Sequence, residues 1–211
     1  MKEDNGLLVI FSKEPEPGLT KTRLISRLGE QGAANLHQRM LVRLLGIAGH
    51  SQFKTTEIWA DRVGASVRLK HYADEYRVSL REQTGGDLGE RMFNAIKSSL
   101  KDYTYVVLIG TDCPCIQEHH LNEAKAILEN GQDVVLGPTE DGGYYLIGAR
   151  KIDISLFQGV DWGTAQVADQ TRIELNRLGY QWQELEELWD VDVPDDLNRL
   201  SGPEYRGLLT G

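Results

Sequence analysis

Residues 7–24 read LLVIFSKEPEPGLTKTRL, and this stretch decides the fold class. It begins with five consecutive apolar residues, which are typical of a strand buried on both faces of a parallel sheet. Two prolines and a glycine then end the run in a loop. A second run, YVVLI at 105–109, follows the same pattern and ends in Gly110, Thr111 and Asp112. The two stretches predict neighbouring buried strands whose carboxyl ends carry loops.

Strands and helices alternate along the rest of the chain. Further strands are expected at 56–60, 133–137 and 144–148, with a weaker candidate at 77–80. Apolar residues three and four positions apart predict helices over 31–48, 87–101, 118–129 and 164–178. Asp87 is the expected cap of the second of these helices, and Asp195 lies near the start of a last short helix. We expect an α/β fold, a three-layer sandwich with a mostly parallel sheet and helices on both faces. Without a linker or repeat, residues 1–211 are expected to form a single domain.

The composition excludes several classes of protein. The chain has 211 residues, a net charge of -9 and a pI near 5.1, which argues against binding to nucleic acid or to an anionic membrane. Because no apolar segment is long enough to span a bilayer and no signal peptide is recognisable, we expect a cytoplasmic protein. Cys113 and Cys115 are too close for an unstrained disulfide, so we expect reduced thiols that pack as small apolar groups.

The loop after the first strand is a candidate phosphate site. Lys13, Lys21 and Arg23 place three positive charges in it, against the overall acidic charge. Gly18 permits positive φ or close approach of a ligand, and Thr22 lies between the last two cations at the entry to a helix, where backbone N–H groups favour anions. The Walker pattern is not matched. The alternative is a solvated loop whose lysines balance Glu14 and Glu16.

Three aspartates are candidate ligands of a divalent metal ion. Asp112 directly follows the central strand, where Mg²⁺ can bridge a carboxylate and a phosphate. Asp190 and Asp192 alternate in WDVDV, so in an extended segment their side chains point the same way. The alternative is that these aspartates cap turns or helices. A zinc site made of the two cysteines with His119 and His120 is disfavoured, because the spacing matches no standard zinc pattern.

Other loops supply further candidates. Asp87 and Arg91 lie at the start of a helix and could contact ribose, base or phosphate of a nucleotide. Glu140 and Asp141 precede two glycines and could serve as general base toward an acceptor hydroxyl. Trp162 could stack on a sugar or a base, and a buried structural aromatic is the equal alternative.

Five ordered motifs carry a family resemblance: KEPEPGLTKTRL (13–24), GDLGERM (86–92), GTDCP (110–114), GPTEDGGYYLIG (137–148) and DWGT (161–164). Together they resemble a bacterial family of uncharacterised glycosyltransferase-like proteins in the nucleotide-diphospho-sugar transferase superfamily, which has the GT-A fold. The resemblance spans about residues 7–200. The layout is also similar to that of molybdenum cofactor and phospholactate guanylyltransferases.

The resemblance implies a site and a chemistry. It implies that Lys13, Lys21 and Arg23 bind phosphates, and that Asp112, with Asp190 and Asp192, binds Mg²⁺ or Mn²⁺. In the interpretation that combines this resemblance with the loop residues, Lys21 and the metal at Asp112 would stabilise a leaving diphosphate, and Asp141 or Glu140, if the base comes from the protein, would act as base. The first loop lacks the usual glycine-rich pattern of the nucleotidyltransferases, and the central strand lacks the D-x-D signature of the glycosyltransferases.

Three functions follow as hypotheses. The first is a glycosyltransferase that uses a nucleotide sugar. The second is a nucleotidyltransferase that joins a nucleoside triphosphate to a small phosphorylated or carboxylated acceptor. The third is a non-catalytic nucleotide-binding protein. The chain is short for a glycosyltransferase, so a small-molecule acceptor would have to bind at about residues 138–190 or at a partner subunit. A homodimer is compatible with the sequence, although no motif indicates one.

Overall fold

The computed structural model describes residues 5–62, 64 and 66–209; the ends of the expected domain, 1–4 and 210–211, lie outside that part. One sheet contains β1 (Gly6–Ser12), β2 (Thr55–Ala60), β3 (Ser79–Glu82), β4 (Tyr105–Ile109), β5 (Val134–Pro138), β6 (Tyr144–Ala149) and β7 (Trp182–Glu184). The α-helices are α1 (Ile25–His50), α2 (Val67–Tyr76), α3 (Leu88–Ser99), α4 (Glu118–Glu129) and α5 (Val167–Arg177). Short 3₁₀ helices are η1 (Thr22–Leu24), η3 (Ile154–Leu156), η4 (Pro194–Ser201) and η5 (Pro203–Tyr205).

The sheet is mostly parallel, as the alternation of strands and helices predicts. Its strand order is β3-β2-β1-β4-β6-β5-β7. β1 pairs in parallel with both β2 and β4, and β7 pairs in parallel with β5. β6 is antiparallel to both of its neighbours, β4 and β5. The carboxyl ends of β1 and β4 are therefore side by side, and the loops that follow them meet at one edge of the sheet.

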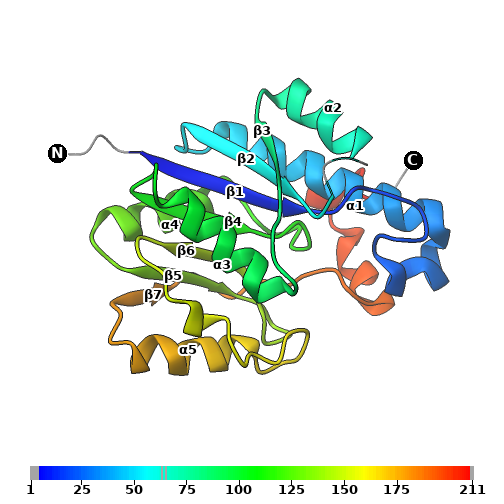
Figure 1. The fold of residues 1–211 in the computed structure, drawn as a ribbon. Coiled ribbons are helices and arrows are strands. Elements are labelled where there is room, and N and C mark those ends of the chain that lie inside the picture. The colour runs from blue at the N-terminus through cyan, green and yellow to red at the C-terminus, as the bar shows by residue number, and fades with distance from the viewer. Residues whose placement is uncertain (1–4, 63, 65, 210–211) are drawn as a thin grey trace.

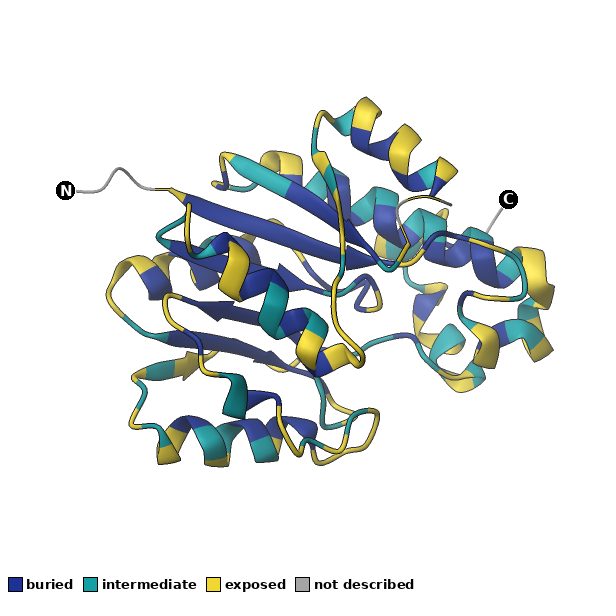
Figure 2. Ribbon diagram, viewed as in Figure 1, coloured by how far each residue is buried: buried dark blue, intermediate teal, exposed yellow. Residues whose placement is uncertain are grey.

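Helices cover both faces of this sheet, which makes three layers (Figure 1). One hydrophobic core joins β1, β2 and β4 to apolar residues of α1, α2 and α4. The opposite face packs against α3 and α5. Figure 2 shows the central strands buried between the helical layers. A smaller core joins the beginning of α1 to the C-terminal segment through Leu24, Val191 and Leu200, so the two ends of the fold meet beside the first loop.

The predicted elements are largely confirmed, with shifts that have local causes. Gly29 (φ 69°, ψ 169°) interrupts the helical geometry of α1, so its regular part begins near the predicted start at 31. The strand expected at 77–80 begins later, because Arg77 ends α2 in the left-handed conformation (φ 55°). Helix α2, whose apolar stripe is short, and the three-residue strand β7 were not predicted.

The predicted caps are confirmed in one case and displaced in the other. The Asp87 carboxylate accepts a hydrogen bond from the Glu90 N–H at 2.8 Å, at the start of α3. At η4 it is Asp196, and not Asp195, whose carboxylate accepts the backbone N–H groups of Asp192 and Val193, at 2.8 and 2.7 Å. This bond pattern fixes the backbone of the DVD segment beside the sheet edge.

The two cysteines are found as the sequence predicts. Cys113 and Cys115 are free thiols, 6% and 9% exposed, and pack in the core as small apolar groups. Within residues 5–62, 64 and 66–209, no helix has both the length and the apolar character that crossing a membrane requires.

The reversed strand β6 depends on a glycine, and this generates a stability prediction. A Cβ at Gly148 would lie 2.6 Å from Val135 Cγ1 and 3.0 Å from Leu128 Cδ1. Gly148→Ala should therefore lower the free energy of unfolding by about 1–3 kcal/mol through overpacking. Urea unfolding of the purified protein measures this change.

Gly46→Ala is the matched control. Gly46 lies in α1, and a Cβ there would meet no described atom within 4 Å. This control should raise the stability by up to about 1 kcal/mol, because alanine has the higher helix propensity. Equal effects of the two substitutions would contradict the packing argument.

Candidate functional site

A cleft of about 660 Å³ opens at the carboxyl ends of β1 and β4. The sequence-predicted residues that line it are Lys13, Lys21, Thr22, Arg23, Asp87, Arg91, Asp112, Asp141, Trp162, Asp190 and Asp192. Gly18 and Glu140 are the candidates that do not line it. The fold thus gathers residues from six distant segments around one cavity of the size of a small-ligand site.

The first loop is anchored by buried Glu14, although several of its other residues are exposed. Glu14 is 9% exposed, and its carboxylate accepts the backbone N–H groups of Arg68 and Leu69, at 2.9 and 3.2 Å, in the first turn of α2. Thr20 Oγ1 donates to the Glu14 carbonyl at 2.8 Å. Glu14 therefore anchors the loop to a helix instead of balancing the lysines. Lys13 makes no ion pair with any described residue, so its ammonium group can meet a ligand.

Gly18 has a conformational role in this loop. Its φ is 80°, which disfavours any side chain, and a Cβ there would lie 3.5 Å from the Glu30 carboxyl group. The glycine therefore permits a turn three residues before Lys21. The predicted close approach of a ligand to Gly18 stays a prediction.

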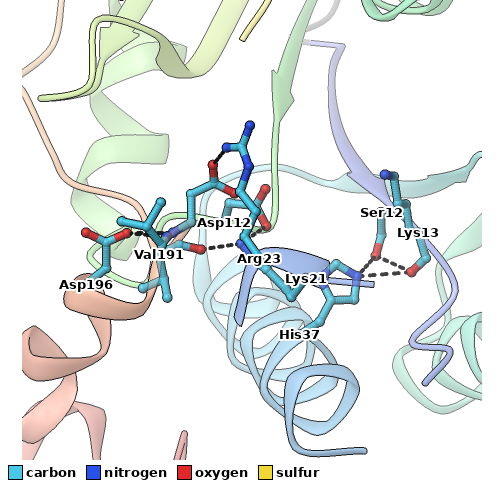
Figure 3. A network of polar contacts seen from close by, with 10 residues as sticks. Ser12, Lys13, Lys21, Arg23, His37, Asp112, Val191 and Asp196 are labelled. Atoms are coloured by element: carbon cyan, nitrogen blue, oxygen red, sulfur yellow. Dashed lines mark hydrogen bonds and ion pairs between the residues drawn. The ribbon is translucent and has the colours of Figure 1, made fainter. Parts of the chain in front are cut away.

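Lys21 connects three parts of the chain. Its backbone is left-handed (φ 52°, ψ 43°), an unfavourable conformation for a lysine that surrounding contacts must sustain. Its ammonium group is 2.7 Å from Asp112 Oδ1 and also donates to the Val191 carbonyl. Figure 3 shows this side chain between the loop after β4 and the C-terminal segment. Only 5% of the Lys21 side chain is exposed, whereas 53% of the Asp112 side chain faces the cleft.

The ionisation of Asp112 follows from its neighbours. Desolvation raises the pKa of this carboxyl group, but the Lys21 ammonium and, more weakly, that of Lys13 outweigh it and hold the pKa below its ordinary value. Asp112 is therefore a carboxylate at neutral pH. Its accessible side chain offers oxygen ligands that a hard divalent cation prefers.

His37 was not singled out in the sequence. It lies on the buried face of α1 and is 3% exposed. Its Nε2 is 3.1 Å from the Lys13 carbonyl and 3.2 Å from Ser12 Oγ, whereas its Nδ1 is buried with no hydrogen-bond partner among the described residues (Figure 3). Burial lowers the pKa of His37, so the ring is neutral. The helical spacing Ala33–His37–Leu41 was the available signal that this histidine faces inward.

The other acidic candidates differ in their surroundings. Burial, and next the Asp141 carboxylate, raise the pKa of Asp190 to about 6, while Lys21 opposes the rise. Asp141 Oδ1 accepts hydrogen bonds from Thr139 Oγ1 at 2.6 Å and the Gly143 N–H at 3.0 Å. Asp192 forms an ion pair with Arg23. With Asp87 and Asp112, five carboxylates thus line one cleft, and a bound cation would reduce the repulsion among those that have no cationic partner.

Glu140 is directed away from this arrangement. Both of its carboxylate oxygens are bound by Arg199, at 2.7 and 2.9 Å, and Arg199 also lies 4.3 Å from the centre of the Trp189 ring. The hydrogen bonds from Arg199 lower the pKa of Glu140. Of the two expected general bases, only Asp141 therefore faces the cleft.

Within the described residues, the one group of His, Cys, Asp and Glu side chains close enough to share a metal ion is His119, His120 and Glu186, outside the cleft. The Gln117 N–H donates to His120 Nδ1 at 2.9 Å, and His120 Nε2 lies 2.6 Å from Glu186 Oε1. A neutral His120 must then carry its proton on Nε2, which removes the lone pair that a metal would need. The predicted ligands Asp112, Asp190 and Asp192 share the cleft but do not form such a close group.

Comparison with known proteins places the chain in a family. The sequence profile described as "Uncharacterized protein conserved in bacteria (DUF2064)" matches residues 47–164. The chain belongs to this family. No curated protein matches it in sequence. A structure from Desulfovibrio desulfuricans G20, provisionally assigned as a nucleotide-diphospho-sugar transferase, is similar with 30% identity and a TM-score of 0.85, over 97% of this chain and 93% of that one.

More distant structures share the fold. A CMP:2-keto-3-deoxy-manno-octonic acid synthetase in complex with CTP has 10% identity and a TM-score of 0.54, over 93% of this chain and 96% of that one. A Mycobacterium tuberculosis H37Rv protein in complex with manganese has 17% identity and a TM-score of 0.52, over 93% and 97%. The α/β fold and the resemblance to the nucleotide-diphospho-sugar transferase type are thus confirmed.

The raised pKa of Asp190 generates a pH prediction. In the unfolded chain its pKa returns toward 3.8, so ionised Asp190 costs folding free energy at pH values above about 6, and the cost disappears below about pH 4. Asp190→Asn should be more stable than the wild type at pH 7.5, and the difference should shrink to zero as the pH falls to 4. Urea unfolding at several pH values, without divalent cations, measures it.

Glu187→Gln is the control for this experiment, because Glu187 is an exposed acid of the same segment outside the cleft lining. Its stability should follow the wild-type pH profile. Parallel profiles of wild type and Asp190→Asn between pH 4 and 8 would show that the Asp190 carboxyl group has an ordinary pKa in the folded protein.

Proposed function

We propose that this protein is a transferase that binds a nucleotide-linked donor together with a divalent metal ion, and that the donor is a nucleotide sugar. One observation carries the proposal: the contact between Lys21 and Asp112 at the floor of a cleft where the loops after β1 and β4 meet. A cation and an accessible carboxylate side by side suit a phosphate and its metal ion.

In this proposal the positive groups of the first loop bind the diphosphate. Lys13 is free of ion pairs with the described residues, Lys21 is at the floor of the cleft, and Arg23 lies at its rim beside Asp192. Thr22 and Arg91 also line the cleft and can contribute hydrogen bonds. Each charged hydrogen bond to phosphate contributes about 1.5–3 kcal/mol. His37 holds the Lys13 carbonyl and thereby the conformation of the loop.

The carboxylates of the cleft fit a resident Mg²⁺ or Mn²⁺. Asp112 and Asp190 would hold the ion, because both line the cleft and carboxylate oxygens suit a hard divalent cation. When bound, the ion would supply charge neutralisation for the leaving diphosphate. Asp192 would become a further metal ligand only after its ion pair with Arg23 is broken. The manganese complex of a structure with the same fold supports this choice of cofactor.

Asp141 is the proposed general base. It faces the cleft, and only Oδ1 accepts hydrogen bonds from described residues, so Oδ2 is open to an acceptor. In glycosyl transfer the acceptor oxygen bonds to the anomeric carbon while the bond from that carbon to the diphosphate oxygen breaks, and the acceptor proton passes to the base. The products are the glycosylated acceptor and a nucleoside diphosphate.

Nucleotidyl transfer is the second candidate. It is favoured by the single aspartate after β4 and by the similarity in fold to a synthetase in complex with CTP. In that case a nucleoside triphosphate would bind to the same cations and release pyrophosphate. A nucleotide-binding protein without catalysis predicts binding but no turnover with any donor.

Ligand-dependent stability tests the proposed site. Wild-type protein should gain about 2.7 kcal/mol of stability at a ligand concentration near 100 times the dissociation constant. We expect this gain with one nucleotide sugar, only when Mg²⁺ is present, and we expect Asp112→Asn to abolish it. Thermal unfolding against a panel of nucleotide sugars and nucleoside triphosphates is the measurement.

Asp102→Asn, at an exposed turn outside the cleft lining, is the control and should respond as the wild type does. A gain with a triphosphate alone would favour nucleotidyl transfer. Equal gains in wild type and Asp112→Asn would remove Asp112 from the site, and no gain with any nucleotide would remove the proposed function.

Lys21 provides an independent prediction. Lys21→Met should weaken nucleotide binding by about 10- to 100-fold, because one charged hydrogen bond to phosphate is lost. It should also raise the pKa of Asp112, since Lys21 is the largest influence that lowers it. Titration calorimetry measures the affinity, with Lys101→Met, an exposed lysine outside the cleft lining, as control. Unchanged affinity in Lys21→Met would contradict the assignment of this lysine.

A further inference from the structure

A second cavity of about 490 Å³ adjoins the cleft, and Asp87 and Trp162 line both. The aromatic rings of Phe93, Phe157 and Trp162 form part of its wall. The residues that line it from η3 and the following loop lie within 154–162, inside the range 138–190 where the sequence analysis expected an acceptor site. The cavity therefore lies next to the proposed donor site, with Asp87 and Trp162 at the boundary between them.

Trp162 is fixed as the wall between the two spaces. Its ring stacks on Phe157 with centroids 6.4 Å apart and meets Tyr144 edge-on at 6.3 Å. A Cβ at Gly89 would lie 2.8 Å from a ring carbon of Trp162, so the ring packs directly on the backbone of α3. The indole N–H finds no acceptor among the described residues, although the side chain is partly exposed. A rigid aromatic face with an available donor is suited to a ligand with both C–H and O–H groups.

The charged side chains that line this second cavity, among the described residues, are all acidic. No lysine or arginine lines it in the described part of the chain, whereas the carboxylates of Asp87 and Glu90 do. Each of these carboxylates accepts one backbone hydrogen bond at the start of α3, through Asp87 Oδ1 and Glu90 Oε2, which leaves the other oxygen open. The cations Lys13, Lys21, Arg23 and Arg91 line only the first cleft. An anionic acceptor would meet like charge here and lose solvation without a counter-ion.

We propose that this second cavity is the acceptor site and that it binds a neutral polyhydroxylated molecule, a sugar or polyol without phosphate or carboxylate groups. The inference rests on the proposed function and names its acceptor class. The Trp162 ring packs against the C–H face of the acceptor, and the indole N–H and the open carboxylate oxygens of Asp87 and Glu90 bind its hydroxyl groups. The like charge at this end of the site then excludes the phosphorylated acceptors expected of a nucleotidyltransferase.

Binding of matched pairs of sugars and sugar phosphates tests the proposal. The probes are glucose, galactose, mannose, glycerol and myo-inositol, each against its phosphate monoester, and saturation-transfer NMR on the full chain measures their affinities. We expect at least one neutral compound to bind and to bind more tightly than its monoester. Trp162→Ala should weaken that binding by about tenfold through loss of the stacking face, and Trp162→Tyr should retain most of it.

Two further variants complete the experiment: one removes a charge from the cavity, and the other is a control outside it. Asp87→Asn keeps a good helix cap but removes the charge, so it should reduce the discrimination against the monoester. Trp182→Phe, outside both cavities, should bind as the wild type does. Tighter binding of the monoesters, no saturable binding of any neutral probe, or equal binding by wild type and Trp162→Ala would each overturn the proposal.

The same preparations separate this proposal from the proposed function. Thermal stabilisation by a nucleotide reports on the donor site and does not require the acceptor cavity. If nucleotides stabilise the protein but neutral probes fail, only the acceptor class is wrong. If neutral probes bind at Trp162 but no nucleotide stabilises the protein, the donor assignment fails and the sugar site remains.

Discussion

The contact between Lys21 and Asp112 is the interaction on which the site depends. It joins the loop after β1 to the loop after β4, and the same ammonium group binds the Val191 carbonyl of the C-terminal segment. Removing Asp112 would leave the buried Lys21 ammonium without its counter-charge, which is more costly than losing an exposed ion pair. The left-handed backbone of Lys21 shows that the surrounding structure holds this residue in place at a cost. Three distant parts of the sequence therefore converge on one cation.

The charge distribution along the cleft explains how an acidic protein can bind an anionic ligand. The cations are concentrated in one loop, where Glu14 is bound by the backbone of α2 and does not neutralise them. Asp112 and Asp192 pair with cations of that loop, whereas burial, and next the Asp141 carboxylate, raise the pKa of Asp190. Beyond Trp162 the lining becomes aromatic and acidic. The proposed order of phosphate, metal ion and acceptor follows this change of charge from β1 toward the loop after η3.

Much of this arrangement was predictable from the sequence, because continuous apolar runs identify β1 and β4 and the loops after parallel strands meet at one edge. The candidate residues of the cleft could therefore be identified from the sequence. The ion pairs of the candidate residues could not be predicted from the sequence. Nothing local indicates that Arg199 binds Glu140 or that Arg23 binds Asp192, because these partners are far apart in the chain. His37 was missed because a single histidine in an apolar stripe resembles a core residue, and the second cavity arises from loops whose packing on Gly89 only the fold reveals.

The most direct test of the central claim is the position of a bound metal ion. Crystals of the protein grown with Mn²⁺ and a stabilising nucleotide would show the ion in an anomalous difference map. The account predicts a peak beside the Asp112 carboxylate, with nucleotide phosphate oxygens within reach of Lys21. A peak at His119, His120 and Glu186, or a nucleotide bound away from Lys21, would contradict it.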